Sequence, residues 1–126
     1  MDLFEKFCNL EKSAEAFGFK WEKVEQIIAQ VKSECVEIET QLLAMETIDA
    51  NRNLQEEIGD LIHAVFSLCL FCQFDPKETF AKSIIKFQKR FEKVKRIAQL
   101  QGYDNLAGQN FESLMQIWEQ AKKESH

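Results

Sequence analysis

Apolar side chains recur along the chain at helical spacing, and short polar or glycine-containing stretches separate the repeats. Between residues 20 and 44, for example, they fall three, four or seven residues apart, as on one face of a helix. These positions are Val24, Ile27, Ile28, Val31, Cys35, Ile38 and Leu42. The pattern predicts five helices, over residues 3–17, 20–44, 53–72, 76–101 and 111–122.

The residues between these stretches suit helix ends. Gly18 and Gly102 follow the first and fourth predicted helices, and Asp75-Pro76 provides an N-cap and a first helical residue. The polar segment Glu46 to Arg52 predicts a turn, with Asp49 and Asn51 as turn or cap residues. The connections are short, so we expect neighbouring helices to pack antiparallel.

Composition supports the same fold class. Four glycines and one proline are few for an all-β protein with many turns. The length of 126 residues suits one domain, and helical pairs of this size often complete their burial by oligomerising. We therefore expect an all-α fold, an antiparallel bundle of about five helices in a single domain over residues 1–126, completed by oligomerisation.

Charge and hydropathy exclude some functions. The net charge of −5 argues against polymeric nucleic acid as a partner. No apolar run approaches ~18 residues, so we expect no membrane span. The charged start, residues 1–6, does not resemble a signal peptide, so we expect a cytoplasmic protein with reduced cysteines. Cys69 and Cys72 lie in the apolar run 64–72 and are interpreted as core residues, not as zinc ligands.

Two acidic pairs stand out from the rest of the sequence. Glu34 and Glu37 are three residues apart on the second predicted helix, and Glu57 and Asp60 have the same spacing on the third. Each pair therefore shares one helix face, and an antiparallel hairpin brings the pairs together. Carboxylates beside an apolar seam repel one another unless a cation is bound, and Mg²⁺ prefers carboxylate oxygens. The alternative to a metal site is that both acidic pairs are solvated surface residues. Gly59, between Glu57 and Asp60, leaves room for the approach of either a facing helix or a ligand.

These residues resemble the MazG-like, all-α nucleoside triphosphate pyrophosphohydrolases. The family signature ExxE…ExxD matches the two acidic pairs, and residues 54–62 resemble its "EELGDLL" helix. Residues 86–94 resemble its "KFxRRFxxV" segment, and residues 117–122 its closing "W–K" helix. The resemblance covers about residues 21–123.

The resemblance implies hydrolysis of a nucleoside triphosphate between the α- and β-phosphorus, releasing pyrophosphate. It also implies dependence on Mg²⁺, for which Mn²⁺ can substitute, and a homodimer or homotetramer with sites near subunit contacts. Two positions depart from the family pattern. Ser33 stands where an acidic residue is common, and Ile84 stands where an asparagine is common, so the substrate preference is left open.

Basic residues concentrate between Lys82 and Arg96. Lys86 and Arg90 are four residues apart and match the family segment, so we interpret them as contacts for the substrate phosphates. Trp118 and Lys122 match the closing motif and are also predicted to bind substrate. Trp118 suits a core or interface position equally well. The aromatic residues of the same basic stretch, Phe87 and Phe91, are expected in the core.

The expected chemistry is metal-assisted attack of water on a nucleotide phosphorus, with Glu34 or Glu37 as general base. Canonical deoxynucleotides and modified nucleotides, whose removal would be a house-cleaning role, both remain open as substrates. His63, three residues after Asp60, is interpreted as an edge residue of the packed seam. It also keeps a rival open, a ferritin-like di-iron or di-manganese protein, which needs an acid–histidine pair. A non-catalytic helical adaptor with a relic metal site is the third reading.

Overall fold

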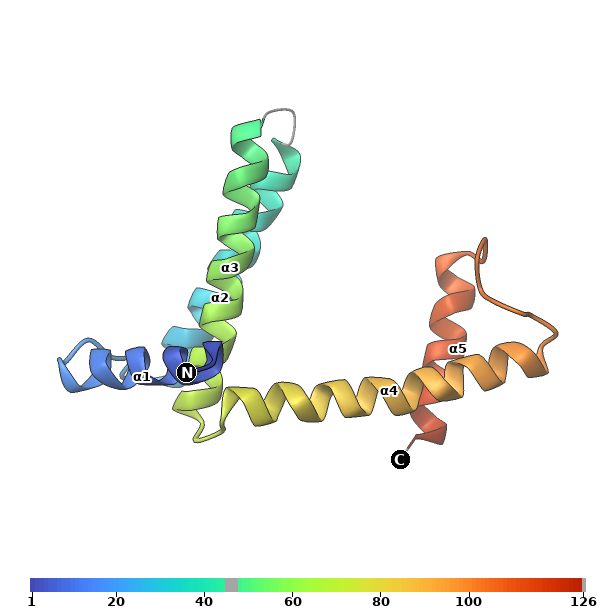
Figure 1. The fold of residues 1–126 in the computed structure, drawn as a ribbon. Coiled ribbons are helices and arrows are strands. Elements are labelled where there is room, and N and C mark those ends of the chain that lie inside the picture. The colour runs from blue at the N-terminus through green and yellow to red at the C-terminus, as the bar shows by residue number, and fades with distance from the viewer. Residues whose placement is uncertain (45–47, 126) are drawn as a thin grey trace. The chain divides into compact units, whose positions relative to one another are not determined.

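The computed structural model describes residues 1–44 and 48–125, and only the backbone of residues 48–52. All regular structure in these residues is helical, which confirms the all-α fold class (Figure 1). The helices are α1 (Leu3–Ala16), α2 (Val24–Leu43), α3 (Ile48–Phe71), α4 (Pro76–Leu100) and α5 (Phe111–Glu124). They form two compact units, unit 1 over Met1–Thr79 and unit 2 over Phe80–His126. The single domain and the oligomer remain predictions.

Most predicted helix ends are close to those observed, but the starts of α2 and α3 differ. Gln26 Oε1 accepts the backbone N–H groups of Glu22 and Lys23, at 2.9 and 3.1 Å. A side chain on the first turn thus satisfies donors that precede the helix. Residues 20–23 consequently form an extended lead-in, and the helix starts at Val24 rather than near Lys20.

The predicted turn over residues 46–52 is wrong for most of its length. Helix α3 already begins at Ile48, so Asp49 and Asn51 lie within it. Residues 45–47 of the predicted turn lie outside the described residues. Polar residues suit the exposed first turns of a helix as well as they suit a loop, because they need no core contact.

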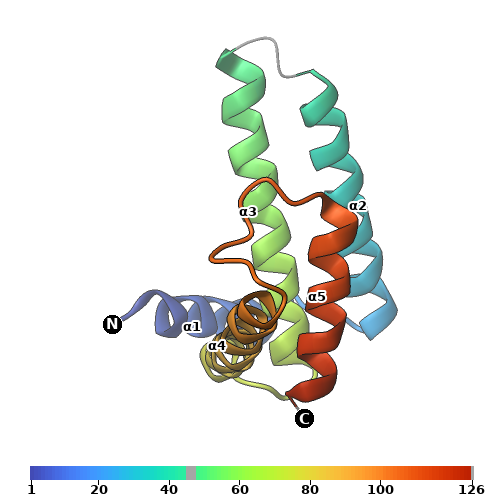
Figure 2. The same cartoon turned by 90° about the vertical axis from the view of Figure 1, so that its right-hand side faces the viewer.

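Unit 1 is built on the hairpin of α2 and α3, which run side by side and antiparallel (Figures 1 and 2). Ile27 and Ala64 are fully or almost fully buried in this unit. Helix α1 lies against α3 through aromatic rings, with Phe4 and Phe7 at 5.5 and 5.9 Å from Phe66 between ring centroids. The α2–α3 pair confirms the expected antiparallel arrangement at the acidic motifs.

Unit 2 has its own small core. Ile97, Ile117 and Ala121 are buried together, and Val94 and Leu106 pack against them. Helix α5 crosses α4 instead of running antiparallel to it (Figure 1). The connection over residues 101–110 is long enough to allow this crossing. Its turns use Gly102 and Gly108, which have positive φ angles that glycine adopts without strain. The expectation that Phe87 and Phe91 are core residues is wrong, since their side chains are 58% and 46% exposed.

Within the described residues, no single helix is long and apolar enough to cross a membrane. Residues 53–71 and 76–100 pass that test only when taken together as a broken pair, by length and composition alone. The four cysteines are free thiols. Cys69 is half-buried and Cys72 is exposed, so the interpretation of both as core residues is wrong for Cys72.

Candidate active site

Three carboxylates from the two acidic motifs meet on the α2–α3 hairpin. One oxygen atom each of Glu34, Glu57 and Asp60 lies within 4.8 Å of the other two. Glu34 comes from α2, and Glu57 and Asp60 come from successive turns of α3. The antiparallel pairing of the two helices thus brings together three of the four carboxylates that the spacing predicted to meet, and Glu37 is not among them.

Glu34 is the most buried member of this group, at 9% exposure. It lies seven residues after Ile27, on the face of α2 that turns inward. Its Oε1 accepts a hydrogen bond of 2.7 Å from Gln30 Nε2. Its Oε2 is buried and has no hydrogen-bond partner in the described residues. A buried carboxylate oxygen without a partner is costly, so this atom is suited to a ligand from outside the chain.

Glu57 shows how the carboxylates affect one another. Its pKa is raised above the ordinary value of 4.5, first by a hydrogen bond with Glu34, then by desolvation, then by the negative charges of Glu37, Glu34 and Asp60. Repulsion of this kind disappears when a cation is shared between the groups. Glu37 is close enough to add to this repulsion, yet it does not belong to the group whose oxygens converge.

The donor set fits a hard divalent cation. Carboxylate oxygens are the ligands that Mg²⁺ prefers, and Mg²⁺ usually takes only a few of them. Gly59, between Glu57 and Asp60, meets nothing within 4 Å of the position that a Cβ atom would occupy. Among the described residues it is therefore not a point of close contact with a facing helix.

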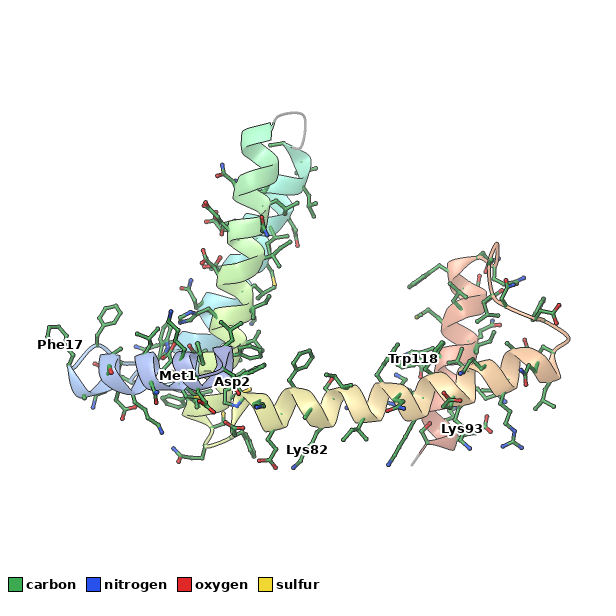
Figure 3. All side chains as sticks on the ribbon, viewed as in Figure 1. Met1, Asp2, Phe17, Lys82, Lys93 and Trp118 are labelled. Carbon is green, nitrogen blue, oxygen red and sulfur yellow. The ribbon has the colours of Figure 1, made fainter. Side chains whose placement is uncertain are left out.

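The predicted substrate-binding residues lie in unit 2, where α5 crosses α4. The guanidinium carbon of Arg90 lies 5.6 Å from the ring centroid of Trp118, in a cation–π contact. Trp118 is labelled in Figure 3. Arg90 Nε is buried without a hydrogen-bond partner in the described residues. Lys122 Nζ pairs with Glu119 at 2.9 Å, and Lys86 is exposed one turn before Arg90. The structure thus brings Arg90 and Trp118 into contact.

One group near the metal cluster was not foreseen. Glu11 Oε1 accepts hydrogen bonds from His63 Nε2, at 2.7 Å, and from Ser67 Oγ, at 2.8 Å. No sequence signal indicated this, because Glu11 precedes Ser67 by 56 residues and belongs to no motif. His63 is therefore engaged by α1, and the three-residue cluster that can hold a metal contains no histidine.

Comparison with known proteins places this geometry in a family. Residues 22–95 match the model of the MazG nucleotide pyrophosphohydrolase domain. The chain belongs to the MazG family. The matched stretch includes all four motif acids, His63, Lys86 and Arg90, whereas Glu11, Trp118 and Lys122 lie outside it.

Individual MazG relatives agree. The chain is 30% identical over 114 residues to the nucleoside triphosphate pyrophosphohydrolase/pyrophosphatase MazG of Thermotoga maritima, covering 90% of this chain and 42% of that protein. It is 26% identical over 116 residues to the nucleoside triphosphate pyrophosphohydrolase of Escherichia coli K12, covering 92% and 43%. The chain thus spans less than half the length of these relatives.

Proposed function

We propose that this chain hydrolyses nucleoside triphosphates to nucleoside monophosphates and pyrophosphate with the help of a divalent cation. The observation that carries the proposal is the convergence of Glu34, Glu57 and Asp60 around the unpartnered Glu34 Oε2. Membership of the MazG family and the names of two relatives support the same activity.

Glu34, Glu57 and Asp60 would hold the cation, with Mg²⁺ preferred and Mn²⁺ as a substitute. When bound, the ion supplies positive charge to the triphosphate and a lowered pKa to a coordinated water. The Glu34 side chain is held for this task by Gln30. In the protein alone, the negative charges around Glu57 raise its pKa, and a bound cation would offset that repulsion.

Glu37 is our choice of general base. It is exposed, it lies beside the cluster, and its oxygens are not among the three that converge. A water oxygen forms a bond to one of the two phosphorus atoms of the α–β bridge. The bond from that phosphorus to the bridging oxygen breaks, and the bridging oxygen leaves with the other phosphoryl group. Glu37 takes the proton that the water loses.

Lys86 and Arg90 are proposed to neutralise the phosphate oxygens, and Lys122 to add a third positive charge. Trp118 supports the Arg90 guanidinium through their cation–π contact. We propose that this contact keeps the guanidinium in place for an anion. We further propose that the active form is a homodimer or homotetramer, because much of the apolar surface of the hairpin is uncovered within unit 1.

The test is release of pyrophosphate from a panel of canonical and modified nucleoside triphosphates, with Mg²⁺, with Mn²⁺ and with EDTA. We expect metal-dependent turnover that falls at least about 100-fold in Glu37→Gln and in Asp60→Asn. Glu39→Gln, on an exposed site of α2, is the matched control and should retain activity. Activity that survives Glu37→Gln combined with Asp60→Asn would refute the assignment. Tight metal binding without turnover of any nucleotide would favour a non-catalytic adaptor.

A further inference from the structure

An open groove of about 2010 Å³ lies within unit 1, between α1, the start of α2 and the C-terminal half of α3. Its lining is mixed, with aromatic rings beside amide, hydroxyl and imidazole groups and beside charged side chains, six of them carboxylates and three of them lysines. Residues that line it include Phe19, Trp21, Gln26, His63, Ser67 and Phe71. Such a lining suits a flat, polar, partly aromatic ligand better than a purely apolar one.

His63 is held in this groove from two sides. Its Nε2 donates to Glu11 Oε1 at 2.7 Å, and the Phe7 ring meets its ring edge-to-face, with 5.1 Å between centroids. The His63 side chain is nevertheless 63% exposed. With Nε2 engaged, Nδ1 is the remaining polar atom of the ring, and the imidazole stays open to a ligand. A ring that is already fixed loses little conformational freedom when a ligand binds.

His63 lines the groove and comes three residues after Asp60 of the carboxylate cluster, whose own residues do not line the groove. Asp60, His63 and Ser67 follow i, i+3, i+7 spacing, so they share one face of α3. Asp60 and His63 are separated by about 4.5 Å along the helix axis, at the usual rise per residue. A ribose separates the α-phosphate of a nucleotide from its base by a comparable length. A nucleotide with its phosphates at Asp60 can therefore place its nucleoside at His63.

We propose that this groove binds the nucleoside part of the substrate and that His63 is a specificity-determining contact within it. Glu11 acts as a positioning residue, because it orients the His63 ring without facing the reacting phosphate. The proposal rests on the proposed function and deepens it. It assigns recognition of the nucleoside to residues of α1 and α3. These residues are different from the proposed phosphate-binding residues of unit 2.

The test separates the two halves of the product. Binding of nucleoside monophosphates and of inorganic pyrophosphate to the full chain is measured by calorimetry, with Mg²⁺ present. We expect His63→Ala to weaken binding of the best nucleoside monophosphate about tenfold or more, as for loss of a positioned hydrogen bond and a ring contact, and to leave pyrophosphate binding within about twofold. In turnover, KM should rise while kcat changes little.

Glu11 is tested by a graded pair of variants. Glu11→Ala should weaken nucleoside monophosphate binding about three- to tenfold through loss of the held imidazole, and Glu11→Gln should restore part of it, since an amide oxygen still accepts hydrogen bonds. Ser13→Ala is the matched control, on an exposed site of α1 that does not line the groove. It should leave both affinities unchanged.

The outcomes are distinct. Equal loss of nucleoside monophosphate and pyrophosphate binding in His63→Ala would show a purely structural role and overturn the inference. Unchanged monophosphate affinity in a folded His63→Ala protein would overturn it as well. If the wild-type chain turns over nucleotides and His63→Ala has the same KM, the inference is refuted but the proposed function stands. A wild-type chain that binds and hydrolyses no nucleotide refutes the proposed function itself.

Discussion

Glu34 combines two roles that conflict in the protein without metal. Its place on the inward face of α2 buries it beside apolar residues, and its Oε2 has no partner among the described residues. A buried acceptor left unsatisfied costs about 1–3 kcal/mol. The unpartnered oxygen therefore weakens the hairpin. In the proposed function the same atom binds the cation, so stability and metal binding would depend on it together.

Exchange of Glu34 for glutamine should separate these roles. In EDTA, we expect Glu34→Gln to raise the free energy of unfolding by about 1 kcal/mol, because an amide can donate to the neighbouring Glu57. In Mg²⁺ the variant should gain no further stability, whereas the wild-type protein should. Urea unfolding with each additive measures both effects. A metal-dependent gain that persists in the variant would contradict the assigned ligand.

Glu57 predicts a pH dependence of stability. Its pKa is raised in the folded protein, so its protonated form is favoured there. Its contribution to stability is present below its ordinary pKa of 4.5 and is lost as the pH rises through the raised folded value. In EDTA, we expect Glu57→Gln to flatten the fall in stability across this range. Thermal melts at a series of pH values measure this. If the stability of the wild type and of the variant fell equally with rising pH, the prediction would be contradicted.

Helix α3 ends in a backbone conformation that is strained for the residue that adopts it. Gln73 has a φ angle of 69°, in the left-handed region, and the N–H of Phe74 donates to the Cys69 carbonyl at 2.8 Å. This is the helix ending that normally carries glycine. Glutamine in that conformation is strained, because its Cβ crowds the backbone.

Replacement of Gln73 by glycine should therefore stabilise the chain. We expect the free energy of unfolding to rise by about 0.5–1 kcal/mol, after allowing for the greater freedom of glycine in the unfolded state. Gly18→Ala is the opposite control, since Gly18 has a φ angle of 97° after α1 and alanine there should destabilise by about 1 kcal/mol. Denaturant unfolding measures both. The same sign for both variants would contradict the argument.

At the scale of the whole molecule, the hairpin leaves apolar side chains uncovered. Ile58, Ile62 and Val65 follow i, i+4, i+7 spacing on one face of α3, and they are 42%, 50% and 40% exposed. A row of this kind on a small protein favours contact with another apolar surface. The proposed homodimer or homotetramer would cover it.

We expect sedimentation velocity to give a mass at least twice that of the chain at micromolar concentration. The double variant Ile58→Glu with Ile62→Glu should shift the protein toward monomer, because charges would then be buried in the contact. Leu3→Glu, which changes a more exposed apolar residue at the start of α1, should leave the mass unchanged. A monomeric wild-type protein would refute the proposed assembly.

Many helix ends and part of the candidate site could be predicted from the local pattern of residues in the sequence. Gly18, Pro76 and Gly102 marked helix ends, and the ExxE and ExxD spacing predicted the meeting of Glu34 with Glu57 and Asp60. Contacts between distant helices could not be predicted, because periodicity reveals which face of a helix is apolar but not which helix covers it. The docking of Glu11 on His63 and Ser67 is of this kind.

The two tryptophans of the chain divide between the two units. Trp21 lines the groove of unit 1, and Trp118 lies against the guanidinium of Arg90 in unit 2 (Figure 3). Each unit thus carries one tryptophan beside the place where we propose that a different part of the nucleotide binds. With Trp21→Phe and Trp118→Phe, emission reports from one end of the substrate at a time. Stopped-flow mixing then gives the order in which the nucleoside and the phosphates engage.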